Sequence, residues 1–294
     1  MTEILLDAVI DTLKLVPFLF VTYWFMEWLE HKTGTKTQAL IRRAGRLGPL
    51  FGGMLGVFPQ CGFSAAAANL YSGGLVTAGT IAAVFISTSD EMVPIFISEA
   101  VPVLTIIKIL AFKFAVAVVF GFILDFIFHE IIHKEIRYKD IHSMCESEHC
   151  KCDEGILKST VHHTLHITLF IFLITLILNL ILHGVGEDKL AMLFTNMPVV
   201  GELIAGIVGL IPNCAASVVI TELYVKGVIG AGPMITGLMA GAGIGMLVMF
   251  RMNKKHPRHN LAILGYVYAA SVLTGILLDF TAVSYTHLRA HATS

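Results

Sequence analysis

Long apolar runs alternate with short polar loops along this chain. Four of the runs, at about residues 9–29, 104–128, 161–182 and 261–282, are about 20 residues long or longer. An α-helix of that length crosses the hydrocarbon core of a bilayer. The pattern therefore predicts an all-α polytopic membrane protein in which these runs are full spans.

One further pattern occurs twice. At a constant offset of 153, residues 48–79 and 201–232 are identical at twelve of 32 positions, and both contain a Pro-x-Cys and a Leu-Tyr-x-x-Gly frame. A second match follows at an offset of 154, between Gly121–Phe126 and Gly275–Phe280. Apolar bias alone would match leucine and alanine but not both frames. The chain is therefore an internal duplication.

Corresponding loops of the two halves differ in charge. The loop at 31–46 has five basic residues and no acidic one, whereas its counterpart at 183–197 has Glu and Asp against one Lys. Further on the bias is reversed: 98–107 has a single Glu, and 251–259 has four basic residues. Basic loops stay on the cytoplasmic side of a membrane. We therefore predict two inverted-topology repeats.

Each duplicated block must then cross the membrane an odd number of times. The segments on either side of Pro59 are only half a span long, and proline breaks a helix. We predict a re-entrant broken-helix hairpin followed by a span at 75–97, and a mirror-image hairpin at 200–226 followed by a span at 228–250. Transporters built from inverted repeats place their binding site between such broken helices.

The chain divides accordingly into three parts and a tail. We expect a first transmembrane repeat at 1–128, a cytoplasmic His/Cys-rich linker at 129–160, and a second, inverted transmembrane repeat at 161–282. From 283 to 294 the sequence is abruptly polar and resembles a cloning read-through, so we expect this tail to be non-native.

Composition restricts the class of protein further. The chain is 56% hydrophobic and only 14% charged, with a mean hydropathy of +0.79, whereas soluble domains carry roughly 25% charged residues. A net charge of −1 gives no indication of a nucleic-acid partner. We expect a multi-pass protein of the cell (inner) membrane whose partner is the lipid bilayer. The sequence has no Gly-x-x-x-x-Gly-Lys-Ser/Thr motif, so ATP bound to this chain does not drive it.

The tips of the two predicted hairpins present polar side chains. Gln60 and Cys61 follow one proline, and Asn213 and Cys214 follow the other. They supply amide oxygens and soft sulfur at the start of a half-helix, whose positive dipole end points to the membrane centre. The alternative is that these residues only let the backbones approach closely.

A second polar group follows the first hairpin, within a predicted span. It contains Ser87, Ser89, Asp90 and Glu91. Two carboxylates in a span are costly unless they are paired or face water, so we expect a locally unwound helix that exposes them. The alternative is a position at the membrane interface. The matching segment at 240–245 is small and neutral, which predicts one cation site rather than two.

Other ionisable groups are secondary candidates. Glu222 takes the place of Asn69 in the second hairpin. The linker contains Cys and His residues that suit Zn²⁺ or another soft divalent ion, or form only a solvated acidic loop. This metal-capture loop, which we expect to be dispensable for transport, consists of His142, Cys145, His149, Cys150 and Cys152.

The segment from His129 to His133 matches the His-Glu-x-x-His pattern of zinc proteases. It falls at the end of a span rather than within the bilayer, and protease chemistry would not explain the duplication. We therefore expect that the chain is not an enzyme. An intramembrane zinc metalloprotease that uses His129, Glu130 and His133 stays open as an alternative, as does a membrane metal sensor.

Three strings resemble a known family: FPQCGFSAAAANLYSGGLVTAGTIAAVFISTSDE at 58–91, GLIPNCAASVVITELYVKGVI at 209–229 and AGAGIGMLVMFRMNK at 240–254. The family is that of the multi-spanning (ten-segment) heavy-metal exporters, also catalogued as arsenic-efflux-like permeases or manganese transporters. The resemblance implies a membrane permease that exports a metal or metalloid ion and holds no permanent cofactor.

The candidate side chains narrow the choice of substrate. Their amide, hydroxyl and carboxylate oxygens suit manganese and similar divalent transition metals, whereas trivalent arsenic prefers several thiolates. Only Cys61 and Cys214 are predicted to reach the membrane centre. We predict a secondary transporter that exports a divalent transition metal such as manganese by alternating access, with the proton as the candidate coupling ion, and we place arsenicals second.

Overall fold

The computed structural model describes residues 47–58, 61–89, 92–132, 156–185, 199–254 and 256–292, and ten positions between 9 and 24. Throughout this part the regular elements are α-helices. They are α3 (Gly48–Val57), α4 (Cys61–Ser72), α5 (Ala78–Ser87), α6 (Met92–Ser98), α7 (Val103–Ile132), α9 (Ile156–Val185), α11 (Val200–Gly209), α12 (Cys214–Val225), α13 (Ala231–Ala240), α14 (Gly243–Met252) and α15 (Pro257–Ala292).

The prediction of an all-α polytopic membrane protein is confirmed. Within the described ranges, four helical segments are long and apolar enough to cross a membrane: Ala78–Ser98, Val103–Phe128, Ala231–Met252 and Pro257–Thr281. Helix α9 covers the predicted span at 161–182. The predicted span at 9–29 falls largely outside the described residues.

The predicted hairpins consist of short helices, as expected. Helices α3 and α11 have 10 residues each, and α4 and α12 have 12. At about 1.5 Å per residue, each covers roughly half of a 30 Å hydrocarbon core. The breaks fall at the two Pro-x-Cys frames. That each hairpin returns to the side from which it enters, and that the halves are inverted, stay predictions.

The second shared frame, Leu-Tyr-x-x-Gly, ends α4 and α12 in the same way. Gly74 and Gly227 both have a left-handed backbone, with φ of 71° and 72°. The amide of each glycine donates to the carbonyl of the tyrosine, and the next amide donates to the carbonyl of the leucine. This pair of bonds is the Schellman motif, which satisfies the last carbonyls of a helix. The sequence repeat is thus a repeat of helix ends.

Both spans that follow the hairpins are interrupted. Helix α5 ends at Ser87 and α6 begins at Met92, which agrees with the expected unwinding. In the second half α13 ends at Ala240 and α14 begins at Gly243, so the predicted span at 228–250 is also two helices. Gly243 has a φ of 53°, a conformation that glycine adopts without steric cost.

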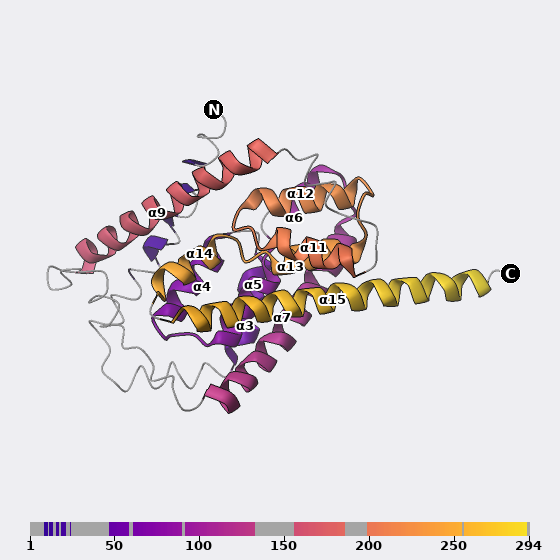
Figure 1. The fold of residues 1–294 in the computed structure, drawn as a ribbon, viewed down its shortest axis with the longest axis horizontal. Coiled ribbons are helices and arrows are strands. Elements are labelled where there is room, and N and C mark those ends of the chain that lie inside the picture. The colour runs from indigo at the N-terminus through magenta and orange to yellow at the C-terminus, as the bar shows by residue number, and fades with distance from the viewer. Residues whose placement is uncertain are drawn as a thin grey trace.

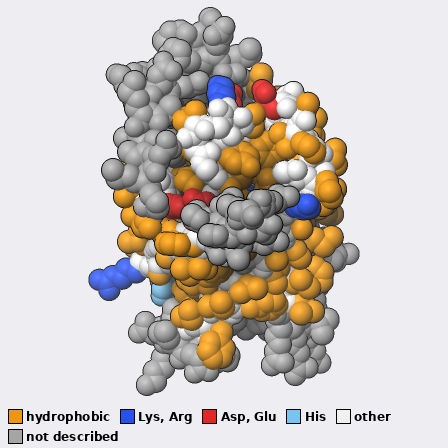
Figure 2. Space-filling model, turned by 90° about the vertical axis from the view of Figure 1, so that its right-hand side faces the viewer, with side chains coloured by type: hydrophobic (Ala, Val, Ile, Leu, Met, Phe, Trp, Pro, Cys, Tyr) orange, Lys and Arg blue, Asp and Glu red, His pale blue; other side chains and the backbone are white. Residues whose placement is uncertain are grey.

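The interrupted helices form an inner layer, and the long continuous helices lie outside it. In an 18-residue apolar stretch of each span, the buried share is 75% for α5–α6 and 78% for α13–α14. It is only 17% for α7 and 39% for α15. In Figure 1, α5 and α13 lie near the centre, and α15 and α7 run past them. Hydrophobic side chains cover much of the described surface in Figure 2. Lipid tails match such a surface, whereas water does not.

The two halves pack internally in the same way. Gly53 in α3 lies against Phe114 and Val118 of α7, and Gly206 in α11 lies against the equivalent residues of α15, Tyr268 and Val272. The halves also interlock, because α14 packs on α4 and α12 packs on α6. The contact of α14 with α4 is close: a Cβ on Gly245 would lie 2.7 Å from the backbone of Ser64.

Candidate functional site

A small cavity with a few polar side chains in its lining lies where the helix breaks of both halves meet. The centre of a water-sized group can move within a volume of about 20 Å³ inside it. This is enough for about one water molecule or a bare metal ion. Its lining comes from both halves of the chain: Thr88, Ser89, Gly209, Ile211, Asn213, Ser217, Gly237, Leu238, Gly241 and Gly243.

Helix ends determine the electrostatics of this cavity. Thr88 and Ser89 follow the C-terminus of α5, and Leu238 and Gly241 belong to the C-terminal end of α13. The carbonyl groups at a helix C-terminus carry partial negative charge. Asn213 immediately precedes the N-terminus of α12, where partial positive charge is found. Gly209 ends α11 and Gly243 begins α14, so the described lining includes the negative ends of three helices and the positive ends of two.

Two of the predicted site residues are brought together here, Ser89 and Asn213. Both side chains are buried, with exposed fractions of 1% and 7%. The hydroxyl of Ser89 donates to the carbonyl of Ser87 at 3.0 Å, which leaves its oxygen lone pairs available. Ser87 itself is fully buried and does not line the cavity, because its hydroxyl turns back to the carbonyls of Ala83 and Val84.

Other predicted site residues lie outside the described residues. These are Gln60, Asp90 and Glu91, together with the whole metal-capture loop (His142, Cys145, His149, Cys150 and Cys152). Cys61 and Cys214 are the first residues of α4 and α12, but the description does not extend to their side chains. All of these assignments stay predictions.

Glu222 occupies a different environment from the cavity. Its carboxylate forms an ion pair with the ammonium of Lys226, one helical turn later, at 2.8 Å. The Glu222 side chain is 40% exposed. The His-Glu-x-x-His segment begins in the last turn of α7, directly after the spanning part Val103–Phe128. Its side chains are not described.

Lys113 is a residue that our sequence analysis missed. It lies within the apolar helix α7 and its side chain is 0% exposed. The Nζ atom donates to the carbonyl of Thr88 and, at 3.3 Å, to the carbonyl of Leu238. Both of these residues line the cavity. The signal was present in the sequence: a lysine inside a predicted span costs about 2.5–3.5 kcal/mol at the bilayer centre and marks a functional site by default.

Glu202 is a second ionisable residue that was missed. It lies in the first turn of α11 and is 1% exposed. Its Oε2 atom has no hydrogen-bond partner within the described part of the chain. Glu202 does not line the cavity, and it replaces Pro49 of the first half.

The described ligand atoms at the cavity are neutral oxygens. Nowhere in the described ranges do three or more His, Cys, Asp or Glu side chains form a group that could hold a metal ion. Hydroxyl groups of Thr88, Ser89 and Ser217, the side-chain amide of Asn213 and main-chain carbonyls are therefore the ligand atoms that the described part of the chain offers. Such oxygens suit hard cations.

A polytopic all-α membrane protein with a cavity between broken helices has the architecture of a membrane transporter. Residues 1–183, more than half of the chain, match the family described as "Putative, 10TM heavy-metal exporter", and the chain belongs to this family. Neither the search of curated proteins nor that of solved structures gave a match.

Proposed function

We propose that this protein is a secondary transporter that exports a divalent transition-metal ion, such as Mn²⁺, through the cavity between its two halves. Membership of a heavy-metal exporter family supports export of a metal ion in general. The choice of a divalent ion and of the site rests on the residues described above.

The observation that carries this proposal is the position of the cavity. Both halves contribute an interrupted helix to it, with Ser89 next to one break and Gly241 at the other. A break leaves main-chain carbonyl groups without helical partners, and these groups replace the water molecules that a cation loses when it enters the membrane. A site between two halves is also the place where a relative movement changes access from one side to the other.

The negative charge that would neutralise the ion comes from the two residues that follow Ser89 in the sequence. Asp90 and Glu91 follow Ser89 directly, and consecutive Cα atoms are about 3.8 Å apart. We expect at least one of the two carboxylates to bind the metal, together with oxygens of Ser89 and Asn213. Uptake of protons by the carboxylates would then return the empty transporter, which couples export to a proton gradient.

Transport by purified protein in proteoliposomes tests this proposal. We expect Mn²⁺ flux with the wild type, and a loss of at least tenfold in the variants Asp90→Asn and Glu91→Gln. Glu99→Gln is the matched control, because Glu99 is an exposed acid just beyond α6. Normal flux in both carboxylate variants would remove these residues from the mechanism.

The same assay distinguishes the metal from the metalloid. Flux of arsenite in preference to Mn²⁺, abolished by Cys61→Ser or Cys214→Ser, would replace the divalent ion by an arsenical as the substrate. Because thiolates bind trivalent arsenic and the carboxylate variants remove only oxygens, the two substrates predict opposite patterns of sensitivity.

A further inference from the structure

The ammonium group of Lys113 lies in a place built for a cation. It donates to two main-chain carbonyl oxygens, one at Thr88 after α5 and the other at Leu238 in the last turn of α13. These are the negative ends of two helices, and they belong to different halves of the molecule. The side chain reaches them from a third helix, α7, and is fully buried.

Carbonyl oxygens at helix ends are also the ligands by which broken-helix transporters hold their ions. The Lys113 ammonium thus uses the same type of ligand, at the wall of the same cavity, as the transported ion would use. The two positive charges would repel each other strongly at this distance in a medium of low dielectric constant.

We infer that the Lys113 ammonium is a tethered cation that occupies the ion site in the substrate-free protein, and that the metal ion binds by displacing it. This inference rests on the proposed function. It makes Lys113 a residue that sets the affinity of the site, because every metal ion that enters must compete with an ammonium group at an effective concentration fixed by its own helix.

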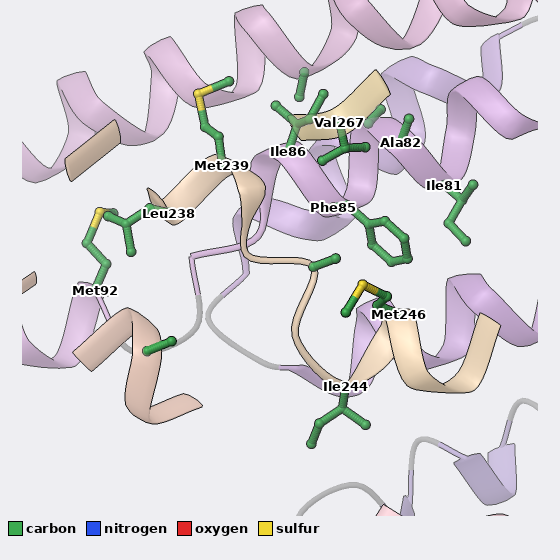
Figure 3. Close-up of a cluster of buried hydrophobic side chains, with 14 of the residues drawn as sticks. Ile81, Ala82, Phe85, Ile86, Met92, Leu238, Met239, Ile244, Met246 and Val267 are labelled. Atoms are coloured by element: carbon green, nitrogen blue, oxygen red, sulfur yellow. The ribbon is translucent and has the colours of Figure 1, made fainter. Parts of the chain in front are cut away.

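The second half has no equivalent of this ammonium. The residue that corresponds to Lys113 at the offset of 154 is Val267, which is fully buried in the apolar cluster of Figure 3. The carbonyl oxygens of Thr88 and Leu238, two residues of the cavity wall, therefore receive an ammonium group from one half only. A single tethered cation agrees with a single transported ion.

A simpler role for Lys113 would be structural, since its two hydrogen bonds tie α5 to α13. The two roles predict opposite results when the charge is removed. Loss of a structural tie would loosen the site and weaken the binding of metal. Loss of a competing cation would vacate two carbonyl oxygens and strengthen it.

Binding of Mn²⁺ to purified protein in detergent separates these roles. We expect Lys113→Met to bind Mn²⁺ at least tenfold more tightly than the wild type and to transport it more slowly, because release then becomes limiting. Lys108→Met is the matched control: Lys108 lies on the same helix with an exposed side chain, and we expect its affinity to be unchanged. Equal or weaker binding by folded Lys113→Met would overturn the inference.

A measurement on the wild type remains decisive if Lys113→Met does not fold. Saturating Mn²⁺ should expose Lys113 to a small amine-reactive reagent, so that its labelling, followed by mass spectrometry, rises at least threefold while that of Lys108 stays constant. Labelling of Lys113 that does not change with Mn²⁺ would refute the displacement. Absence of Mn²⁺ binding by the wild type would instead overturn the proposed function and this inference with it.

Discussion

The two halves of the molecule share a helix arrangement and differ in the polar and charged side chains that they place near the cavity. Helices α3 and α11 pack on α7 and α15 through equivalent glycines, and α4 and α12 end in the same left-handed turn. At the interrupted helices, however, the first half has Ser87, Thr88 and Ser89 where the second has only Ala and Gly. The first half also supplies Lys113, whose counterpart Val267 packs with Ile86 and Ala82 in Figure 3.

This difference shows which properties a duplication must keep. Glycines at close contacts and helix ends determine the backbone path, and they are retained in both copies. Charged side chains at the cavity are needed once, because a cavity shared by two halves can take its charge from either. The second half contributes the uncharged side chains of Asn213 and Ser217, together with space and carbonyl oxygens.

The largest loss of stability is expected where helices of the same half pack very closely against a glycine. A Cβ on Gly209 would lie 2.2 Å from the carbonyl oxygen of Gly237, and one on Gly56 would lie 2.5 Å from that of Val84. Gly209→Ala and Gly56→Ala should each lower the unfolding free energy by about 3 kcal/mol or more, because backbone atoms must move. Thermal stability in detergent measures this effect.

Gly265→Ala is the control for both glycine variants. Nothing lies within 4 Å of a Cβ at Gly265, in the middle of α15, and alanine should be neutral or stabilise the helix by up to about 1 kcal/mol. Wild-type stability of only one of the two variants, Gly209→Ala or Gly56→Ala, would show that the two halves are packed differently.

A smaller effect is expected at the carboxylates that cap α5 and α13. Asp125 accepts bonds from the Gly79 amide and the Thr77 hydroxyl, both at 2.7 Å, whereas Asp279 accepts one from the Gly232 amide at 2.8 Å. Asp125→Ala should lower the unfolding free energy by about 2 kcal/mol and Asp279→Ala by about half as much. The second half has Gly230 in place of Thr77 and so lacks the hydroxyl.

The double variant Thr77→Val, Asp125→Ala checks this difference in unfolding experiments. Thr77 also caps α5, since its hydroxyl oxygen accepts from the Thr80 amide at 3.1 Å, so the double variant should be about 1 kcal/mol less stable than Asp125→Ala alone. Because both partners of the hydroxyl bond to Asp125 are absent, the total loss should still be smaller than the sum of the two single losses. Additive losses would contradict the role assigned to Thr77.

The left-handed turn at the end of α12 should make Gly227→Ala cost about 1–2 kcal/mol of unfolding free energy, because a residue with a Cβ is strained in this conformation. No atom lies within 4 Å of a Cβ at Gly227, so Gly227→Ala tests the backbone conformation alone. Asn tolerates a positive φ better than Ala, and Gly227→Asn should recover part of the stability. A thermal midpoint that does not differ between the two variants would argue against the strain.

The smallest effect is expected at Glu222. An exposed ion pair one turn apart on a helix contributes about 0.3–0.5 kcal/mol, so Glu222→Gln should leave both stability and Mn²⁺ flux nearly unchanged. Its counterpart Asn69 in the first half is fully buried, and Asn69→Ala should be the more damaging of the two. A large loss of Mn²⁺ flux in Glu222→Gln would indicate that this carboxylate takes part in transport.

Much of the fold follows from local sequence signals. The Pro-x-Cys and Leu-Tyr-x-x-Gly frames mark helix breaks and helix ends, and the Ser-Thr-Ser run marks the end of α5. The break between α13 and α14 was not predicted, because small apolar residues at 240–245 continue a helix as readily as they interrupt one. Their close packing against residues distant in sequence, such as Gly245 on Ser64, decides the outcome.

The candidate site was predicted less completely. Ser89 and Asn213 were found because each stands next to a break. Lys113 was overlooked because its surroundings in sequence are apolar, and only the packing of α7 against α5 brings its ammonium to Thr88. A side chain that serves a site from a neighbouring helix has no motif around it.

One hydrogen bond joins the long outer helices directly. The phenol oxygen of Tyr266 in α15 donates to the carbonyl oxygen of Phe120 in α7 at 2.7 Å, so it links the two halves away from the cavity. Any rocking of one half on the other must either pivot about this link or sever it. If it is the pivot, the distance between these two atoms should stay constant while other distances from one half to the other change.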